Sequence, residues 1–429
     1  MKRNCFTPVT EFFENNRYGY TLNVVSRWLV GLVFLFSAFV KGVDPMGTMF
    51  KIEEYMSTWS IFGLTFDWAI PLAGVLSVVL VCAEFLVGVM LIFNSFRILS
   101  AWLLALMMAF FTVTTFIDAV TDLVSDCGCF GDALKLTNWE TFWKNVFLDV
   151  FAVIIFFTRR LRYRRRLERD LIVVIVAAVA MVIFCIYNIK HEPVIDFRAW
   201  KKGNAMVKHQ EPENIIKFRS VKDTTLVKEI RYKKWDEVDS VYNDETLWEA
   251  IDAATTPEFV VLADGFSMLA VDPDDTTATL SMDQTLNILP NSNGVIFVTV
   301  YDLAKVDKEG VEEIKNAVKL DSALNADGYD IRLVLLTSMD PKGDSVSLAK
   351  VQEWLSDNDI NGIQVNVLDA MGDNNVYFTD ATAIKTIMRG NPGFMFVKNG
   401  VVVDKQRKVG ELTLDINSLK LIKEDEKEN

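Results

Sequence analysis

Two cysteines lie one residue apart in the stretch SDCGCFGDALKLTNW, residues 125–139, of a chain that has only five cysteines. Gly128 alone separates Cys127 from Cys129, and glycine has the dihedral freedom that the small ring of such a disulfide demands. A strained, exposed disulfide is easily reduced and is therefore a good oxidant. The spacing indicates redox chemistry, and two simpler interpretations stay open: a fixed loop disulfide, or two free thiols. A metal site is not expected, because one short cysteine pair without a nearby histidine falls short of four ligands.

The compartment of these thiols follows from five apolar stretches within the first 190 of 429 residues. A transmembrane helix needs about 20 mostly apolar residues, so the pattern predicts a helical membrane bundle. Buried helices of a soluble domain are the alternative. The stretches are Leu22–Val40, Trp68–Phe93, Ile98–Ala119, Val146–Thr158 (extended backwards by Trp143) and Leu171–Ile189.

A short basic loop, RRLRYRRRLER at residues 159–169, sets the expected orientation. Lys- and Arg-rich short loops stay in the cytoplasm, which places the N-terminus inside and the loop with Cys127 and Cys129 outside. Everything after Ile189 is then also outside, in the periplasm of a Gram-negative cell, where disulfides persist. A nucleic-acid patch is the other interpretation of the arginines, but the flanking spans and the acidic exported part oppose it. We therefore expect a protein of the cytoplasmic (inner) membrane, with the lipid bilayer as a partner and no nucleic acid.

Charged residues within the spans need partners. Glu84 lies inside the second span, so we expect it to face the bundle interior and to pair with Arg27 near the inner end of the first span. A structural ion pair is favoured over a proton relay. Lys41, Asp44 and Asp118 are expected at the outer ends of their spans, in contact with water or headgroups.

The remaining cysteines differ in depth. Cys5 is expected in the cytoplasm, Cys82 well down the second span, and Cys185 near the outward end of the fifth. Cys185 is thus the other thiol that could approach the loop. A small apolar filler is the alternative, because free cysteines often pack as ordinary hydrophobic residues.

The chain after residue 190 has a soluble composition. Residues 191–256 form a linker and a small α+β extension, with an expected strand in TTLVKEIRY and an expected helix in DETLWEAIDAA. Residues 257–429 begin with an expected hairpin at Asp264–Gly265 and then alternate strands with helices. A final hairpin turns at Asn399–Gly400. Such alternation is typical of an α/β domain.

The segments CGCFGDALKLTNWETFWKN and VGLVFLFSAFVKGVDPMGT make the first 190 residues resemble the DoxX-like membrane proteins, in particular the MauE-type branch. The resemblance implies a four-helix membrane bundle, here with a fifth helix, and an association with thiol redox chemistry. In the MauE branch it also implies disulfide formation in an exported enzyme. The residues that match the loop motif are Cys127, Gly128, Cys129, Phe130 and Gly131.

The order of elements after residue 257 resembles thioredoxin-like domains of the TlpA type, and GNPGFMFVKNG is similar to their cis-proline segment, which implies that Pro392 is the cis-proline. The redox dithiol of that family would follow the first long strand, where this chain has VYDLAKVDKEG. No cysteine occurs after Cys185. This domain therefore lacks the CxxC pair, and a client-binding or docking role is more plausible for it than exchange.

Two functions fit these observations. In the first, the protein is a membrane component of thiol–disulfide redox: Cys127 and Cys129 turn over, a quinone or a partner thiol accepts the electrons, and the outer domain holds an envelope client. In the second, it is a non-catalytic scaffold or assembly factor of an envelope complex with a structural CGC loop. The absence of a second paired-cysteine motif counts against the first, and the oddity of a strained CxC as a structural disulfide counts against the second. A transporter is disfavoured by the lack of internal repeats and broken spans.

The orientation can be tested with reporter fusions placed after residue 200. A reporter that is active only in the periplasm should be active there. The basic loop at 159–169 keeps the connection between the fourth and fifth spans in the cytoplasm, so the chain after the fifth span lies outside. A fusion active only in the cytoplasm would contradict the orientation.

Overall fold

The computed structural model describes residues 16–58, 60–61, 64–122, 130–134, 136–159, 167–234, 238–263, 265–271, 280–338, 348–363 and 375–414. The chain divides into two compact units, residues 1–198 and 199–429.

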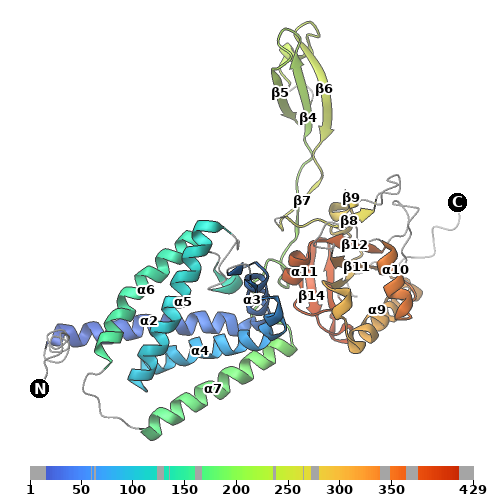
Figure 1. Cartoon of the computed structure of the whole chain (residues 1–429). Helices are drawn as coiled ribbons and strands as arrows, with labels where there is room; N and C mark the ends of the chain where they lie inside the picture. Colours follow the sequence, from blue (N-terminus) through green and yellow to red (C-terminus); the bar gives the residue numbers. More distant parts are fainter. Residues whose placement is uncertain are drawn as a thin grey trace, which may run out of the picture. The chain divides into compact units, whose positions relative to one another are not determined.

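The first unit is a helical bundle (Figure 1). Five of its helical segments are long and apolar enough to cross a membrane, so the chain is a multi-pass membrane protein. The longer helices are α2 (Arg17–Val43), α3 (Pro45–Thr58), α4 (Ala73–Phe93), α5 (Arg97–Thr121), α6 (Asn138–Thr158) and α7 (Leu167–Lys190). The short elements are β1 (Ser60–Ile61), β2 (Leu64–Thr65), η1 (Asp67–Leu72) and η2 (Gly131–Ala133).

Local sequence fixes where α6 begins. The Thr137 hydroxyl caps the backbone N–H of Glu140, and the Glu140 carboxylate accepts from the Thr137 N–H at 2.9 Å. This reciprocal capping box starts the helix at Asn138, eight residues before the apolar stretch at Val146. The fourth span is therefore a full 21 residues.

Two glycines let α2 and α4 approach closely. A Cβ on Gly31 would lie 3.2 Å from the Gly88 carbonyl oxygen, and one on Gly88 would lie 3.0 Å from that of Gly31. Small residues at such a crossing allow the two backbones to touch. In a membrane the hydrophobic effect does not drive helices together, so this close packing stabilises their association. The crossing fixes which residues of the two helices face each other.

The second unit is built on a seven-stranded sheet with the order β14-β13-β10-β11-β12-β8-β9. Strands β10, β11 and β12 run parallel, and β13, β14, β8 and β9 add antiparallel neighbours on the two sides. The strands are β8 (Leu269–Val271), β9 (Leu280–Asp283), β10 (Val295–Val300), β11 (Arg332–Ser338), β12 (Val376–Thr379), β13 (Gly393–Lys398) and β14 (Val401–Gln406). The helical elements are α8 (Thr285–Ile288), η5 (Leu303–Lys305), α9 (Lys308–Ala326), α10 (Leu348–Asp357), α11 (Ala381–Ile387) and η6 (Val409–Glu411).

Helices cover both faces of this sheet. Every residue of β10 is buried. On one face Ile296 packs with Ile314 of α9, and on the other Phe297 packs with Ile384 of α11. A strand covered on both faces reads as a continuous apolar run, as VIFVTV does.

Before this sheet the chain forms two small ones. Strand β3 (Val207–His209) pairs with β7 (Phe259–Val261). The chain between these two strands forms a three-stranded antiparallel sheet in the order β5-β4-β6 (Figure 1). Its strands are β4 (Asn214–Ser220), β5 (Val227–Tyr232) and β6 (Trp248–Thr255), and η4 (Ser240–Asn243) precedes β6.

Two expectations about this part are wrong. The helix expected in DETLWEAIDAA is strand β6, because residues 248–255 pair along β4 and that pairing overrides local helix propensity. The hairpin expected at Asp264–Gly265 does not form as a strand pair: β7 pairs with β3, whereas β8 pairs with β12 and β9. The strand expected at 363–369 falls almost wholly outside the described residues.

The expectations further along the chain are confirmed. Helices α9, α10 and α11 lie where the alternating pattern placed them, and β13 and β14 form the last hairpin. Its turn has positive φ at Asn399 (50°) and Gly400 (72°), which is the Asn-Gly signature of a two-residue turn. The Asn391–Pro392 peptide bond is cis.

The α9 helix carries a carboxyl group whose ionisation opposes folding. Burial raises the pKa of Asp321 from 3.8 to about 6, although the Asn325 amide, 3.3 Å away, lowers it in part. A group whose pKa is higher in the folded state than in the unfolded state stabilises the fold fully at pH values below its unfolded-state pKa. That contribution is lost as the pH rises through its folded-state pKa. This helix should therefore become less stable between about pH 4 and pH 7.

Asp321→Asn should remove that loss, because an amide does not ionise. We expect α9 in the full chain to be more protected from hydrogen exchange than in the parent at pH 7.5, and equally protected at pH 4.5. Glu312→Gln on the same helix is the matched control, since the Glu312 pair with Lys319 is exposed. Equal protection of parent and Asp321→Asn at pH 7.5 would contradict the assignment.

Candidate functional site

A cluster of charged and polar side chains lies inside the bundle between α2 and α4. The Lys41 ammonium donates to the Glu84 carboxylate at 2.5 Å, and the Ser37 hydroxyl donates to its other oxygen at 2.8 Å. Both charged side chains are buried: Glu84 is 1% exposed and Lys41 8%. A charge is tolerated within a membrane protein when it is paired in this way.

Helix geometry brings these residues together. The helices α2 and α4 are consecutive spans, so residues after Gly31 in α2 face residues before Gly88 in α4. Side chains on a helix tilt toward its N-terminus. Lys41 therefore reaches back along α2 toward Ser37, while Glu84 leans toward the end of the bundle that holds Lys41. We call this end, where α3 follows α2, the α3 end.

The ion pair borders a cavity of about 30 Å³. Its polar lining is Ser37, Lys41, Glu84, Lys144 and Asn145, and aromatic rings including Phe130 close it. A space of this size with several polar neighbours holds about one water molecule.

Phe130 holds the chain after the CGC motif against this cavity. Its ring is 8% exposed, lies 5.4 Å from that of Phe36 on α2, and has the Lys144 ammonium 4.4 Å from its centroid. The next residue, Gly131, has a φ of +51°, and a Cβ there would lie 3.4 Å from Val40. Residues 123–129, which include Cys127 and Cys129, lie outside the described residues.

The expected pairing of Glu84 with Arg27 is wrong. Glu84 binds Lys41 and Ser37, and ten residues of α2 separate Ser37 from Arg27, about 15 Å along the helix axis. Arg27 instead borders a cavity of about 10 Å³ at the other end of the bundle with Arg97 and Arg159. The depth estimate failed because it ignored the direction in which long side chains tilt.

Two residues expected at the membrane surface are buried. Lys41 is the cation of the ion pair, and Asp118 on α5 is 0% exposed and accepts a hydrogen bond from the Tyr55 hydroxyl at 2.6 Å. Tyr55 belongs to α3, so this connecting helix supplies the hydroxyl that meets the buried Asp118 carboxylate. A residue near the end of a span is therefore not necessarily exposed, because a connecting helix can supply its partner.

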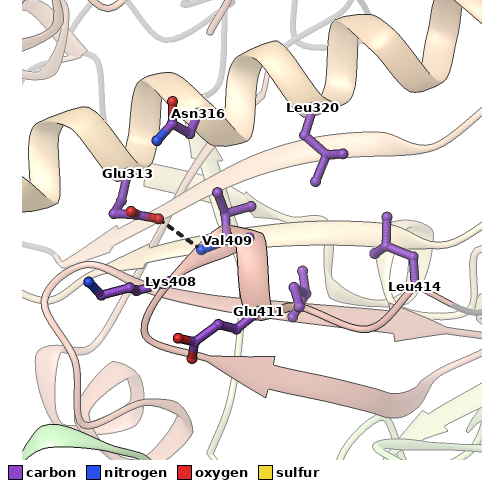
Figure 2. A pocket seen from close by; sticks show the side chains of 9 residues that line it. Glu313, Asn316, Leu320, Lys408, Val409, Glu411 and Leu414 are labelled. Carbon is purple, nitrogen blue, oxygen red and sulfur yellow. Dashed lines mark hydrogen bonds between the residues drawn. The ribbon is translucent and has the colours of Figure 1, made fainter.

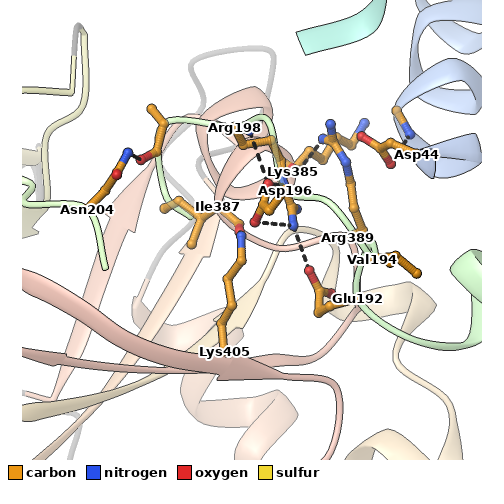
Figure 3. A network of polar contacts seen from close by, with 12 residues as sticks. Asp44, Glu192, Val194, Asp196, Arg198, Asn204, Lys385, Ile387, Arg389 and Lys405 are labelled. Carbon is orange, nitrogen blue, oxygen red and sulfur yellow. Dashed lines mark hydrogen bonds and ion pairs between the residues drawn. The ribbon is translucent and has the colours of Figure 1, made fainter. Parts of the chain in front are cut away.

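Arg198 fixes the segment that follows α7. Its guanidinium is 1% exposed and lies 2.7 Å from both Glu192 Oε2 and Asp196 Oδ1, as Figure 3 shows. Burial alone would lower the pKa of Arg198, but these carboxylates outweigh burial and raise it above its ordinary value. The arginine stays charged and binds residues 192–198 into a tight turn.

The second unit has a polar arrangement where β10 meets α9. The Asn391 side chain accepts from the Tyr301 N–H at 3.0 Å and donates to the Asp302 carbonyl at 2.7 Å. A Cβ on Gly310, in the first turn of α9, would lie 2.5 Å from Pro392. The Asn391 side chain and the Pro392 ring thus fill this place, and no cysteine lies in the sequence between β10 and α9.

A cavity of about 550 Å³ lies between α9 and η6 in this unit (Figure 2). Leu320, Leu412 and Leu414 make it largely apolar. The Glu313 carboxylate at its rim accepts from the Val409 N–H at 3.0 Å. Lys408 and Glu411 are the other charged residues of its lining.

Together these features define a multi-pass membrane protein with a buried ion pair beneath its α3 end and an α/β unit after the last span. The profile of the family described as Methylamine utilisation protein MauE matches residues 20–158. This region runs from α2 to α6 and includes Lys41, Glu84 and Phe130, whereas α7 and the second unit lie beyond it. No curated protein and no solved structure matches the chain.

The Lys41–Glu84 pair can be tested by a double-mutant cycle. Lys41→Met or Glu84→Leu alone should lower thermal stability in detergent sharply, because removing one partner of a buried pair costs about 3–5 kcal/mol. The double variant Lys41→Met/Glu84→Leu should recover most of that loss, since no uncompensated charge remains.

Arg27→Met is the matched control, because Arg27 is a cation on the same helix away from Glu84. Its effect should add to that of Glu84→Leu without coupling. Coupling of Glu84 to Arg27, with none to Lys41, would contradict the pairing.

Proposed function

We propose that the protein is a membrane component of thiol–disulfide exchange in the cell envelope, in which Cys127 and Cys129 are the reactive pair. The loop disulfide takes two electrons from the dithiol of an envelope client, through a mixed disulfide, and becomes a dithiol. A lipid-soluble quinone or a partner disulfide then takes two electrons and two protons from that dithiol and restores the loop disulfide.

The observation that carries this proposal is the position of Phe130. Cys129 is joined to Phe130 by one peptide bond, and consecutive Cα atoms lie about 3.8 Å apart. Phe130 in turn closes the cavity beside Lys41 and Glu84. The reactive pair is thus tethered directly to the buried polar cluster.

The cluster supplies the electrostatics that thiol exchange needs. The attacking species is a thiolate, and a nearby ammonium group stabilises it. Lys144, with its ammonium 4.4 Å from the Phe130 ring centroid, supplies such a group next to the residue that follows Cys129. The buried Lys41–Glu84 pair lines the cavity next to this segment and places one charge of each sign there.

The second unit is proposed to hold the client. We infer a thioredoxin-like fold for it, which the order β14-β13-β10-β11 with parallel β10 and β11 supports. The contacts of Asn391 and Gly310 occupy the place where that fold would carry a dithiol. Without a cysteine the unit binds and orients a client, and the loop carries out the exchange.

This function requires the α3 end, the CGC loop and the second unit on the outer side of the cytoplasmic membrane. The basic stretch at 159–169, which connects α6 to α7 in the sequence, supports that orientation.

The proposal predicts that Cys129→Ser traps mixed disulfides. Without Cys129 the adduct on Cys127 cannot resolve, so reducible higher-mass species should accumulate in acid-quenched, alkylated membranes. In the parent, alkylation should find the pair in both dithiol and disulfide forms in growing cells.

Cys127→Ser/Cys129→Ser is the control and should give no adducts. If the pair is oxidised under all growth conditions, and the double variant leaves envelope disulfide content unchanged, the exchange function fails and the scaffold function remains.

A further inference from the structure

A second pair of thiols lies inside the bundle. Cys82 on α4 and Cys185 on α7 are both free, and Cys82 packs against the buried cluster that contains Cys185. More than a hundred residues of sequence separate them, so the packing of α7 against α4 alone brings them together.

The position of α7 is fixed next to this pair. The Asn188 amide donates to the Gly42 carbonyl at 3.1 Å, and a Cβ on Gly42 would lie 2.2 Å from Met181 Cε. Met181, Cys185 and Asn188 form the buried stripe of α7, spaced three to four residues apart on one helix face. Cys185 is therefore held toward Cys82 by a contact on each side of it.

The surroundings of the pair are apolar. Cys185 is fully buried among Ala38, Val81 and Met181, and Cys82 is half-buried beside them. A charged, water-soluble oxidant such as glutathione disulfide is excluded from such a site. A lipid-soluble two-electron acceptor can reach Cys82 from the membrane.

We propose that Cys82 and Cys185 form a reversible intramembrane dithiol/disulfide pair whose oxidant is a membrane quinone. The two S–H bonds break and one S–S bond forms. Two electrons and two protons pass to the quinone, which becomes a quinol. In the reverse direction a quinol returns the dithiol.

The inference goes beyond the loop chemistry and does not depend on it. Cys185 lies outside residues 20–158, so the pair is not part of the region similar to the MauE family. If the loop also turns over, the chain carries two cysteine pairs, one in the loop and one among the helices.

The test uses the full chain with Cys5, Cys127 and Cys129 all replaced by Ser, in lipid nanodiscs. The reduced protein receives a short-chain ubiquinone analogue, and free thiols are then counted by maleimide mass tags after denaturation. We expect the count to fall from two tags to none, with one quinol formed per chain by absorbance.

The same background with Cys185→Ala is the matched control and should keep its single tag without forming quinol. Its elution as a monodisperse species shows that the bundle is intact. Retention of both tags, with no quinol, would overturn the inference and leave the two cysteines as apolar filling. Because the loop cysteines are absent, this result does not depend on whether the loop pair turns over.

Discussion

The ion pair of Lys41 with Glu84 is the interaction on which the membrane unit depends. Each charge alone would be destabilising in the bundle interior, so the pair ties the end of α2 to the middle of α4. Ser37 satisfies the second carboxylate oxygen, and the Gly31–Gly88 crossing brings the backbones close enough for both contacts. A wider crossing would leave both charges without partners.

The same constraint links the interior to the surface. The cavity beside the ion pair is closed by Phe130, which belongs to the segment just after the CGC motif. A conformational change in the loop that moved Phe130 would expose the pair to water and alter its electrostatics. Phe130 therefore links the segment after the CGC motif to the buried charges.

The second unit is organised around its sheet. Its seven-stranded sheet has a fully buried central strand, β10, and helices on both faces. At the end of β10 the Asn391 side chain bonds the backbone at Tyr301 and Asp302, and Gly310 packs on Pro392. These contacts join the end of β10 to the segment before β13 and to the first turn of α9.

The sequence by itself determined the five spans, the α/β character of the second unit, helices α9 to α11 and the last hairpin. Each is encoded locally: by the length of an apolar stretch, by apolar residues that recur every 3.6 or every 2 residues, or by a pair of turn residues such as Asn399–Gly400. Only the tertiary structure decided the partners: Lys41 for Glu84, Cys185 for Cys82, β4 for β6, and β3 for β7. These contacts join residues far apart in the chain, and their geometry depends on helix crossing, side-chain tilt and strand register. No local pattern carries that information.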